Sequence, residues 1–261
     1  MITLLTDFGL RDCYVGVMKG AIAQIDPHLR TVDLNHNIPP QDIPAARFNL
    51  LAAYAYCPQG TVHLVVVDPG VGTARRAVAV ELSQGFLVGP DNGIFSGVLQ
   101  QESAIAAVEL NNSDYWRTPT PSRTFHGRDI FAPAAAHLAS GVPIQKLGST
   151  IDSNSLVTVD LPAYSIQAEG ITGSIQYIDG FGNLISNISQ SALPEPAANW
   201  GVLLKGQTIP LRQTYGEVAS GQLVALIGSH GWLEVALNGG SAAETLSAQF
   251  RDRLELVHLG R

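Results

Sequence analysis

The stretch LVVVDPGVGTARRAVAVEL, residues 64–82, joins two apolar runs through an aspartate, a Pro-Gly-Val-Gly segment and two arginines. Short apolar runs bounded by turn residues are typical of buried strands. The glycines suggest a phosphate loop, but such a loop needs a following helix and a Walker lysine. A strand pattern follows here instead, so the stretch predicts a strand, a turn and a second strand.

Upstream of this stretch, short apolar runs alternate with helical patterns, which indicates an α/β N-terminal domain with a mostly parallel sheet. Downstream, two adjacent apolar runs separated by a polar turn predict a hairpin. We predict strands at 2–6, 31–34, 62–67, 76–82, 85–90 and 104–110, and helices at 14–25, 43–56, 93–100 and 129–140.

The pattern changes in the last third of the chain. From about residue 168 helical signals nearly vanish, and short strands follow one another between Gly, Asn and Pro residues. Regular short strands of this kind predict a smaller all-β C-terminal domain, a barrel or a sandwich. We therefore expect an α/β domain at 1–162 and a β-barrel-like domain at 168–261.

Composition limits the function classes. The 261 residues carry a net charge of -7, which argues against a nucleic-acid partner. The apolar runs are too short to span a membrane and the N-terminus shows no signal-peptide pattern, so we expect a cytoplasmic protein without a membrane partner. Cys13 and Cys57 have no metal-ligand spacing, and we expect both to be buried and reduced.

Candidate polar residues follow the predicted strands, where open α/β sheets bind their ligands. Asp7 and Asp12 are placed either to bind a ribose diol or to cap the next helix. Asp68 either closes the turn or pairs with one of the two arginines, Arg75 and Arg76.

Two further groups stand out. His126 lies in TFHGRD, residues 124–129, next to Phe125, and is either structural or catalytic. In the C-terminal part, Asp179, Phe181 and Asn183 surround two glycines, a pattern that also suits a plain hairpin turn. Each of these signals is weak alone.

Taken in chain order, the motifs resemble one enzyme family, the S-adenosyl-L-methionine hydroxide adenosyltransferases, also called S-adenosyl-L-methionine hydrolases. These are related to fluorinating and chlorinating enzymes that act on the same substrate. The resemblance runs from residue 2 to about 258 and rests on TDFG (6–9), HNIPPQD (36–42), DPGVGTARR (68–76), GPDNGIF (89–95), TFHGRDIFAPAAAHLA (124–139), DGFGNLISNI (179–188) and GSHGWLEVALNGGSA (228–242).

The resemblance implies a homotrimer whose sites lie between the N-terminal domain of one subunit and the C-terminal domain of the next. It implies hydrolysis of S-adenosyl-L-methionine to adenosine and L-methionine, with no metal or cofactor. The implied catalytic residues are Asp68, His126 and Arg75, with Arg75 favoured over Arg76 by its place after GVGTA.

The resemblance also implies substrate contacts. Relatives carry a tryptophan where Gln41 stands, and the halogenating enzymes an arginine where Leu237 stands, so these two contacts differ here. The implied binding residues are Asp7 for the ribose hydroxyls, Asp12 and Asp179 for the methionine ammonium, Ser229 and the His230 amide for its carboxylate, Asn183 and the backbone near Gly239 for adenine, Phe181 and Tyr215 for stacking, and Phe125 as an apolar wall.

The attacking group is the remaining question. The halogenating relatives bind a halide near the same turn, where this chain carries Asp68. A carboxylate repels an anion, which favours water. Two alternatives stay open: a binding protein for adenosine or S-adenosyl-L-methionine without turnover, and a halide-using adenosyl transferase.

Overall fold

A computed structural model describes residues 1–167, 169–194 and 199–259. The chain divides into two compact units, Met1–Val159 and Asp160–Arg261. The larger elements of the first unit are β1 (Ile2–Thr6), α1 (Tyr14–Ile25), β2 (Thr31–Asn35), α2 (Ile43–Tyr54), β3 (Thr61–Val66), β4 (Ala77–Glu81), β5 (Gly85–Pro90), α3 (Ser96–Leu99), β6 (Ala106–Glu109), α4 (Ala132–Ala139) and β7 (Ser149–Thr150).

The sheet of the first unit is mixed. Its strand order is β2-β1-β3-β5-β4-β6-β7. The first four strands run parallel, whereas β4, β6 and β7 join by antiparallel pairing. The prediction of a mostly parallel sheet is therefore wrong for the part of the sheet that β4, β6 and β7 form, because the β4–β5 hairpin reverses the chain direction. That hairpin was itself predicted and is confirmed.

The opening stretch forms β3, a turn and β4, as predicted. The two strands are not neighbours, however, because β5 lies between them in the sheet. The turn therefore passes over the end of β5, with backbone hydrogen bonds from Val71 N to the Asp68 carbonyl and from Thr73 N to the Gly70 carbonyl. A strand follows the glycines, so the phosphate-loop alternative is excluded.

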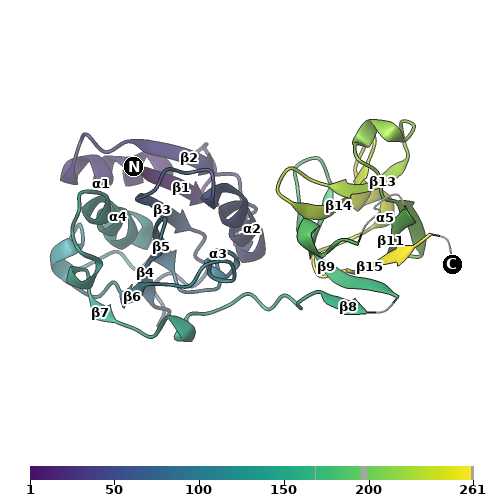
Figure 1. The fold of residues 1–261 in the computed structure, drawn as a ribbon. Coiled ribbons are helices and arrows are strands. Elements are labelled where there is room, and N and C mark those ends of the chain that lie inside the picture. The colour runs from purple at the N-terminus through teal and green to yellow at the C-terminus, as the bar shows by residue number, and fades with distance from the viewer. Residues whose placement is uncertain (168, 195–198, 260–261) are drawn as a thin grey trace. The chain divides into compact units, whose positions relative to one another are not determined.

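Helices cover both faces of this sheet, with α1 and α4 on one side and α2 and α3 on the other (Figure 1). Apolar residues of α1 at helical spacing, Val15, Met18 and Ile22, are buried. The core between α1, α4 and the sheet contains Ile2 and Leu4 of β1. Alternate β1 residues thus face opposite helix layers, as the two-residue period of a strand requires.

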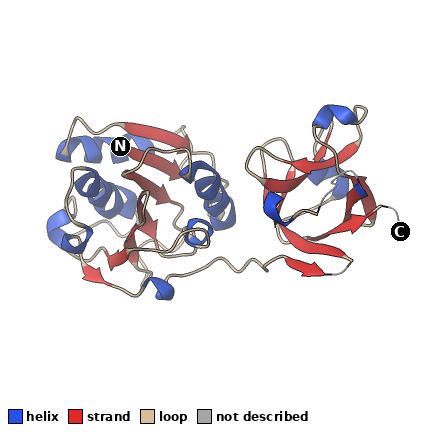
Figure 2. Cartoon of the chain, in the orientation of Figure 1, coloured by secondary structure: helices blue, strands red, loops and turns tan. Residues whose placement is uncertain are grey.

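Strands are the main elements of the second unit, with short helical turns and loops between them (Figure 2). Its sheet is antiparallel throughout the order β12-β11-β15-β9-β10-β14-β13, with β8 added on β9. The elements are β8 (Ser165–Gln167), β9 (Gly170–Ile178), β10 (Leu184–Ser189), β11 (Trp200–Leu204), β12 (Gln207–Pro210), β13 (Leu223–Ile227), β14 (Trp232–Leu237), α5 (Ala242–Leu246) and β15 (Arg253–His258).

The ends of that sheet meet. Leu211, just after β12, forms a parallel bridge with Ala225 of β13, and Arg212 N donates to the Ala225 carbonyl at 2.8 Å. The sheet therefore nearly closes on itself, which selects the barrel over the sandwich. The short helix α5 was not predicted; Ser241 caps it by accepting from Glu244 N.

Within the described residues, no helix is long and apolar enough to cross a membrane. Both cysteines are free thiols, but Cys13 is exposed and Cys57 partly exposed, so the expectation that they are buried is wrong. Cys13 sits in the loop before α1, outside the core that this helix builds.

Candidate active site

Two side chains of the turn after β3 and one from the loop before α4 form a row of hydrogen bonds. Arg75 donates through Nε to Asp68 Oδ1 at 2.9 Å and through Nη2 to Asp68 Oδ2. Nη2 also lies 2.9 Å from Nδ1 of His126. The Asp68 and Arg75 side chains are only 5% and 11% exposed. The sheet therefore brings together the three residues that the family resemblance implied.

The donor pattern fixes the state of His126. A guanidinium only donates, so Nδ1 of His126 must accept and the ring proton sits on Nε2. Burial lowers the pKa of His126, and the positive charge of Arg75 lowers it further, against the opposing charges of Asp68 and Asp129. In this geometry His126 is a neutral ring that offers an N–H donor.

The neighbouring arginine, Arg76, binds other partners than Asp68 and His126. Arg76 donates through Nε and Nη2 to Asp91 at 2.8 and 2.6 Å, and through Nη1 to the Ser155 hydroxyl at 2.9 Å. Arg75 instead lies over the ring of Phe131, 5.1 Å from its centroid. Successive residues leaving the turn thus point to opposite sides, and only Arg75 meets Asp68 and His126.

A close approach of two loops sets this geometry. Gly72 has a φ of 74°, and a Cβ there would lie 2.2 Å from the carbonyl oxygen of Arg123. Only glycine fits both the left-handed backbone and that contact. The contact holds the turn after β3 against the segment that leads to His126.

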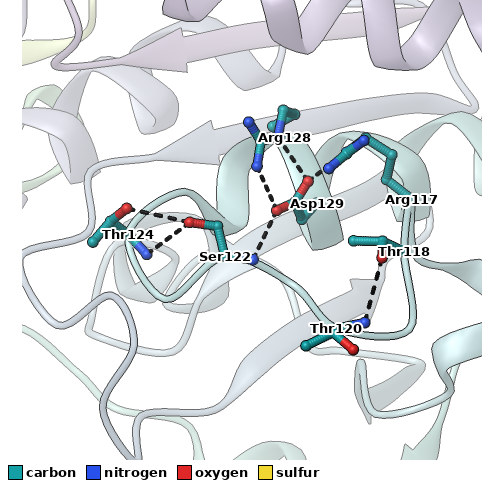
Figure 3. A network of polar contacts seen from close by, with 7 residues as sticks. All are labelled: Arg117, Thr118, Thr120, Ser122, Thr124, Arg128 and Asp129. Atoms are coloured by element: carbon teal, nitrogen blue, oxygen red, sulfur yellow. Dashed lines mark hydrogen bonds and ion pairs between the residues drawn. The ribbon is translucent and has the colours of Figure 1, made fainter.

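Asp129, a fully buried carboxylate, holds the segment that leads to His126 in place. Its oxygens accept from Arg117 Nε at 2.5 Å, from Arg128 Nε and Nη2 at 2.7 and 2.8 Å, and from Ser122 N at 2.9 Å (Figure 3). Burial alone would raise the pKa of the Asp129 carboxyl, but these donors, Arg128 foremost, hold it below its usual value. Ser122 also bonds Thr124, so the whole loop is tied to one charge.

A cavity of about 410 Å³ opens beside this chain of hydrogen bonds. Asp68 and His126 line it, and Asp7 faces it from the end of the neighbouring parallel strand β1. Phe8, Tyr14 and Phe125 contact one another and form an aromatic wall. The lining consists of Asp7, Phe8, Tyr14, Pro40, Gln41, Val66, Asp68, Pro69, Val71, Thr124, Phe125, His126 and Gly127.

Neither aspartate after β1 caps α1. Its N-cap residue is Cys13, which makes no side-chain cap hydrogen bond. Asp7 instead accepts at Oδ2 from the backbone N–H of Gln41 at 2.8 Å, and Gln41 holds a φ of 67°. Asp12 is exposed and does not line the cavity. The capping alternative is therefore wrong, and Asp7 alone of the pair faces the cavity.

The second unit has a cavity of its own, about 510 Å³. Two aromatic side chains in its wall are unusually open, Phe181 at 81% and Tyr215 at 43% exposed. Exposed aromatic rings suit stacking on a flat apolar ligand. The lining consists of Phe181, Asn183, Tyr215, Leu237, Asn238, Gly239 and Gly240.

Asp179 organises the turn beside this cavity. Its Oδ1 accepts from Phe181 N and Asn183 N, both at 2.9 Å, and its Oδ2 accepts from Asn183 Nδ2 at 2.9 Å. Because the amide nitrogen of Asn183 is engaged, the side chain can offer a ligand its oxygen, an acceptor. Asp179 therefore orders this turn, and it does not line the cavity.

Ser229 and His230 lie in the turn before β14, outside the cavity lining. The sequence reasoning missed a residue close by, Glu234 on β14, which contacts both His230 and Tyr215. A glutamate at the centre of the apolar run WLEVAL is the signal that was available. Asp129 and Tyr14 were also not assigned to a site, since their placement depends on how distant loops fold.

Metal ligation has no support in the described part of the chain. Among residues 1–167, 169–194 and 199–259, no group of three or more His, Cys, Asp or Glu side chains is placed to hold a metal ion.

Comparison with known proteins yields one consistent family. Models described as the SAM hydroxide adenosyltransferase N-terminal and C-terminal domains match residues 2–148 and 173–255. A protein of Salinispora tropica named (R)-S-adenosyl-L-methionine hydrolase is 41% identical, with 98% of this chain and 97% of the relative covered. A protein of Actinoplanes named fluorinase is 29% identical, with 93% and 92% covered. A crystal structure of an uncharacterized protein from Thermotoga maritima superposes with a TM-score of 0.92 at 33% identity, covering 99% of this chain and all of that one.

Proposed function

Because the chain belongs to the SAM hydroxide adenosyltransferase family, we propose that it hydrolyses S-adenosyl-L-methionine to adenosine and L-methionine. The observation that carries the proposal is the Asp68–Arg75–His126 chain beside the first cavity. It offers a neutral N–H donor and a carboxylate acceptor at one wall, which is what a water molecule needs for orientation.

The chemistry requires help at the nucleophile only. The oxygen of water forms a bond to ribose carbon 5′ while the bond from that carbon to the sulfonium sulfur breaks. The electron pair moves to sulfur, so methionine leaves as a neutral thioether and needs no acid. The surplus proton must leave the attacking oxygen, and proton transfer to a positioned base contributes about 10²–10⁴-fold in such reactions.

We assign these roles to the three residues. His126 donates from Nε2 to the attacking oxygen and orients it. Asp68 accepts a hydrogen bond from the attacking water and then takes the proton that this water loses. It can do so because each carboxylate oxygen has a second acceptor position besides the one that binds Arg75. Arg75 holds Asp68 in place and keeps the His126 proton on Nε2. In-line placement of the oxygen, about 3–3.5 Å from carbon 5′, lowers the barrier further.

The same wall favours water over a halide. Asp68 is a carboxylate that lines the cavity. A halide approaching it would meet a like charge in a partly desolvated site, where repulsion is strong. We therefore propose hydrolysis rather than halogenation, although a relative named fluorinase is 29% identical to this chain.

Substrate contacts divide between the two units in this proposal. In the first unit Asp7 binds the ribose hydroxyls and Phe125 forms an apolar wall. In the second, Phe181 and Tyr215 stack on adenine, and its edge meets Asn183 and the backbone near Gly239. Asp12 and Asp179 face the methionine ammonium, and Ser229 with the His230 amide its carboxylate.

We further propose a homotrimer in which the first unit of one subunit and the second unit of its neighbour share each site. The support is the family resemblance, together with candidate binding residues in both units. Neither cavity contains all of them.

Incubation with S-adenosyl-L-methionine in ¹⁸O-labelled water tests the reaction. We expect adenosine and methionine in equal amounts, with the heavy oxygen in adenosine and none in methionine, and a rate that does not depend on chloride. Binding without adenosine formation would instead support a non-catalytic binding protein. A product that requires halide would support a halogenase. Either result from folded protein would overturn the proposal.

A further inference from the structure

One charged side chain is almost completely buried in the second unit and has no role in the proposed reaction. Glu234 lies in the middle of β14 and is 3% exposed. Burying a carboxylate is costly unless donors compensate it, so its partners show why it is there. We propose that Glu234 is a positioning residue that holds Tyr215 and His230 with one carboxylate and thereby couples the two ends of the substrate subsite. This inference rests on the proposed function.

The first bond fixes the aromatic wall. The Tyr215 hydroxyl donates to Glu234 Oε1 at 2.8 Å. Tyr215 lies on a short 3₁₀ turn, Tyr215–Glu217, whose backbone is held by the Thr214 and Glu217 capping pair. Those contacts fix the backbone of the turn, and the bond to Glu234 fixes the ring over the second cavity. Burial raises the pKa of Tyr215, and Glu234 raises it further, so the hydroxyl remains a donor.

The second bond fixes the turn before β14. Glu234 Oε2 lies 3.1 Å from Nε2 of His230, and the Trp232 N–H donates to Nδ1 of the same ring at 3.2 Å. Because Nδ1 accepts, the ring proton sits on Nε2 and is donated to the carboxylate. The proposed methionine contact of His230 is made by its backbone amide, whereas its side chain contacts Glu234 and the Trp232 N–H.

The packing leaves this arrangement little freedom. A Cβ at Gly228 would lie 2.5 Å from Cε1 and Nε2 of His230 and 2.6 Å from Oε2 of Glu234. The backbone at the end of β13 therefore lies directly against both groups. Displacing the carboxylate from either partner leaves a buried charge short of a donor, which shifts the other partner as well.

The shared carboxylate would couple the part of the site that binds adenine, at Tyr215, to the part that binds the methionine carboxylate, at His230. If Glu234 acts in this way, the side chain of His230 affects the binding of adenosine even though adenosine has no methionine part. A purely local role for each residue predicts no such effect.

The test uses the full chain and two measurements, adenosine affinity by calorimetry and the steady-state kinetics of S-adenosyl-L-methionine hydrolysis. We expect Glu234→Ala to weaken adenosine binding and to raise KM about 10-fold, with kcat changed far less, as loss of a buried charged hydrogen bond implies. Tyr215→Phe and His230→Ala should each weaken adenosine binding in the same direction.

Two comparisons separate positioning from general damage. Glu234→Gln should restore most of the affinity, because its oxygen can accept from His230 while its amide donates to the Tyr215 oxygen. The double variant Tyr215→Phe/Glu234→Ala should bind adenosine no more weakly than Glu234→Ala alone, since the bond is already lost. Should Glu234→Ala not fold, the pair Tyr215→Phe and His230→Ala with their double variant gives the same comparison.

The inference would be overturned if the fold-changes in adenosine affinity of the single variants multiplied in the double variants. It would also be overturned if Glu234→Ala had a native unfolding midpoint and an unchanged adenosine affinity. A wild-type protein that neither binds adenosine nor hydrolyses S-adenosyl-L-methionine would overturn the proposed function and this inference with it. If the wild type is active and the fold-changes of the single variants multiply in the double variants, only the inference about Glu234 is overturned and the proposed function stands.

Discussion

At the scale of single residues, the candidate catalytic chain depends on the direction of each hydrogen bond. Asp68 can only accept, Arg75 can only donate, and His126 can do either. The order acceptor, donor, imidazole therefore leaves one arrangement of protons, with Nε2–H of His126 available to the cavity.

The two adjacent arginines provide a matched pair of variants. We expect Arg75→Lys to lower kcat about 10²-fold, because one ammonium cannot donate to both Asp68 oxygens and to His126 in the geometry of the guanidinium fork. Arg76→Lys should keep kcat and lower only the unfolding midpoint, since its partners are Asp91 and Ser155. Turnover and thermal unfolding measure the two effects. Equal losses of kcat would contradict the assignment.

The pH dependence of turnover follows from His126. Its pKa lies below the ordinary 6.5, first because of burial and then because of Arg75. The lowered pKa favours the neutral ring near neutral pH, and we expect the acid limb of kcat/KM below the ordinary 6.5. The ring titration followed by NMR in wild type, with His126→Asn to identify the signal, checks the assignment. An acid limb above pH 6.5 would rule out the neutral donor.

At the scale of elements, loops that follow parallel strands carry the first cavity. β1 and β3 are parallel neighbours, so Asp7 and Asp68 emerge at one edge of the sheet. This much follows from strand order, and the sequence predicts it. The contact between the turn after β3 and the loop before α4 joins segments about fifty residues apart, and no local pattern reports it.

A glycine pair tests that contact. Gly72 and Gly60 both have a left-handed φ, 74° and 81°, but a Cβ at Gly60 meets nothing within 4 Å. Gly60→Ala should cost about 1–2 kcal/mol of stability from backbone strain alone. Gly72→Ala adds the clash with Arg123, and we expect a larger loss together with lower turnover. Urea unfolding and kcat distinguish the two. Equal stability losses with unchanged turnover would contradict a loop contact that positions His126.

Besides His126, another histidine, His63 on strand β3, has a lowered pKa, and it lies in the core. His63 is 1% exposed, its Nδ1 lies 2.9 Å from the Thr3 hydroxyl, and burial lowers its pKa to about 4. Between pH 6.5 and about 4 the unfolded chain binds a proton that the folded chain does not, so stability falls as the pH falls. The difference corresponds to roughly 3 kcal/mol.

His63→Asn checks this expectation, because the amide can keep the bond to Thr3 but cannot be protonated. Urea unfolding between pH 7 and 4 should show a shallower loss of stability in the variant than in wild type. Identical pH dependence in both proteins would mean that His63 is not a source of the acid sensitivity.

At the scale of the whole molecule, the candidate binding residues occur in two compact units. Each unit has its own core and its own cavity. In the proposed trimer, each site would join the first unit of one chain to the second unit of its neighbour, and such head-to-tail contacts form a closed ring when the rotation between subunits closes.

Mixing two inactive variants tests the shared site. Asp68→Ala damages the first unit and Asn183→Ala the second, and each alone should be nearly inactive. If neighbouring chains share sites, co-assembled protein should recover about a quarter of wild-type turnover, the fraction of sites free of both lesions in a random trimer. Light scattering of the wild type gives the number of chains. No recovery from co-assembled trimers would place both halves of the site in one chain.

The sequence by itself determined the elements and the family. Apolar runs and turn residues predict nearly every strand, the β4–β5 hairpin and the change to an all-β region, because burial and turn chemistry are local properties. Seven motifs in order predict the family and name Asp68, Arg75 and His126 as a set. Local patterns could not exclude a mostly parallel sheet, because strand direction depends on which strands pair.

Only the tertiary structure decided how those residues meet. It separates Arg75 from Arg76, assigns the proton of His126 to Nε2, and shows Asp179 ordering a turn. It also brings Glu234 between Tyr215 and His230, a contact that no motif indicates. The physical reason is the same in each case: the direction of a hydrogen bond and the burial of a charge depend on partners that are distant in the chain.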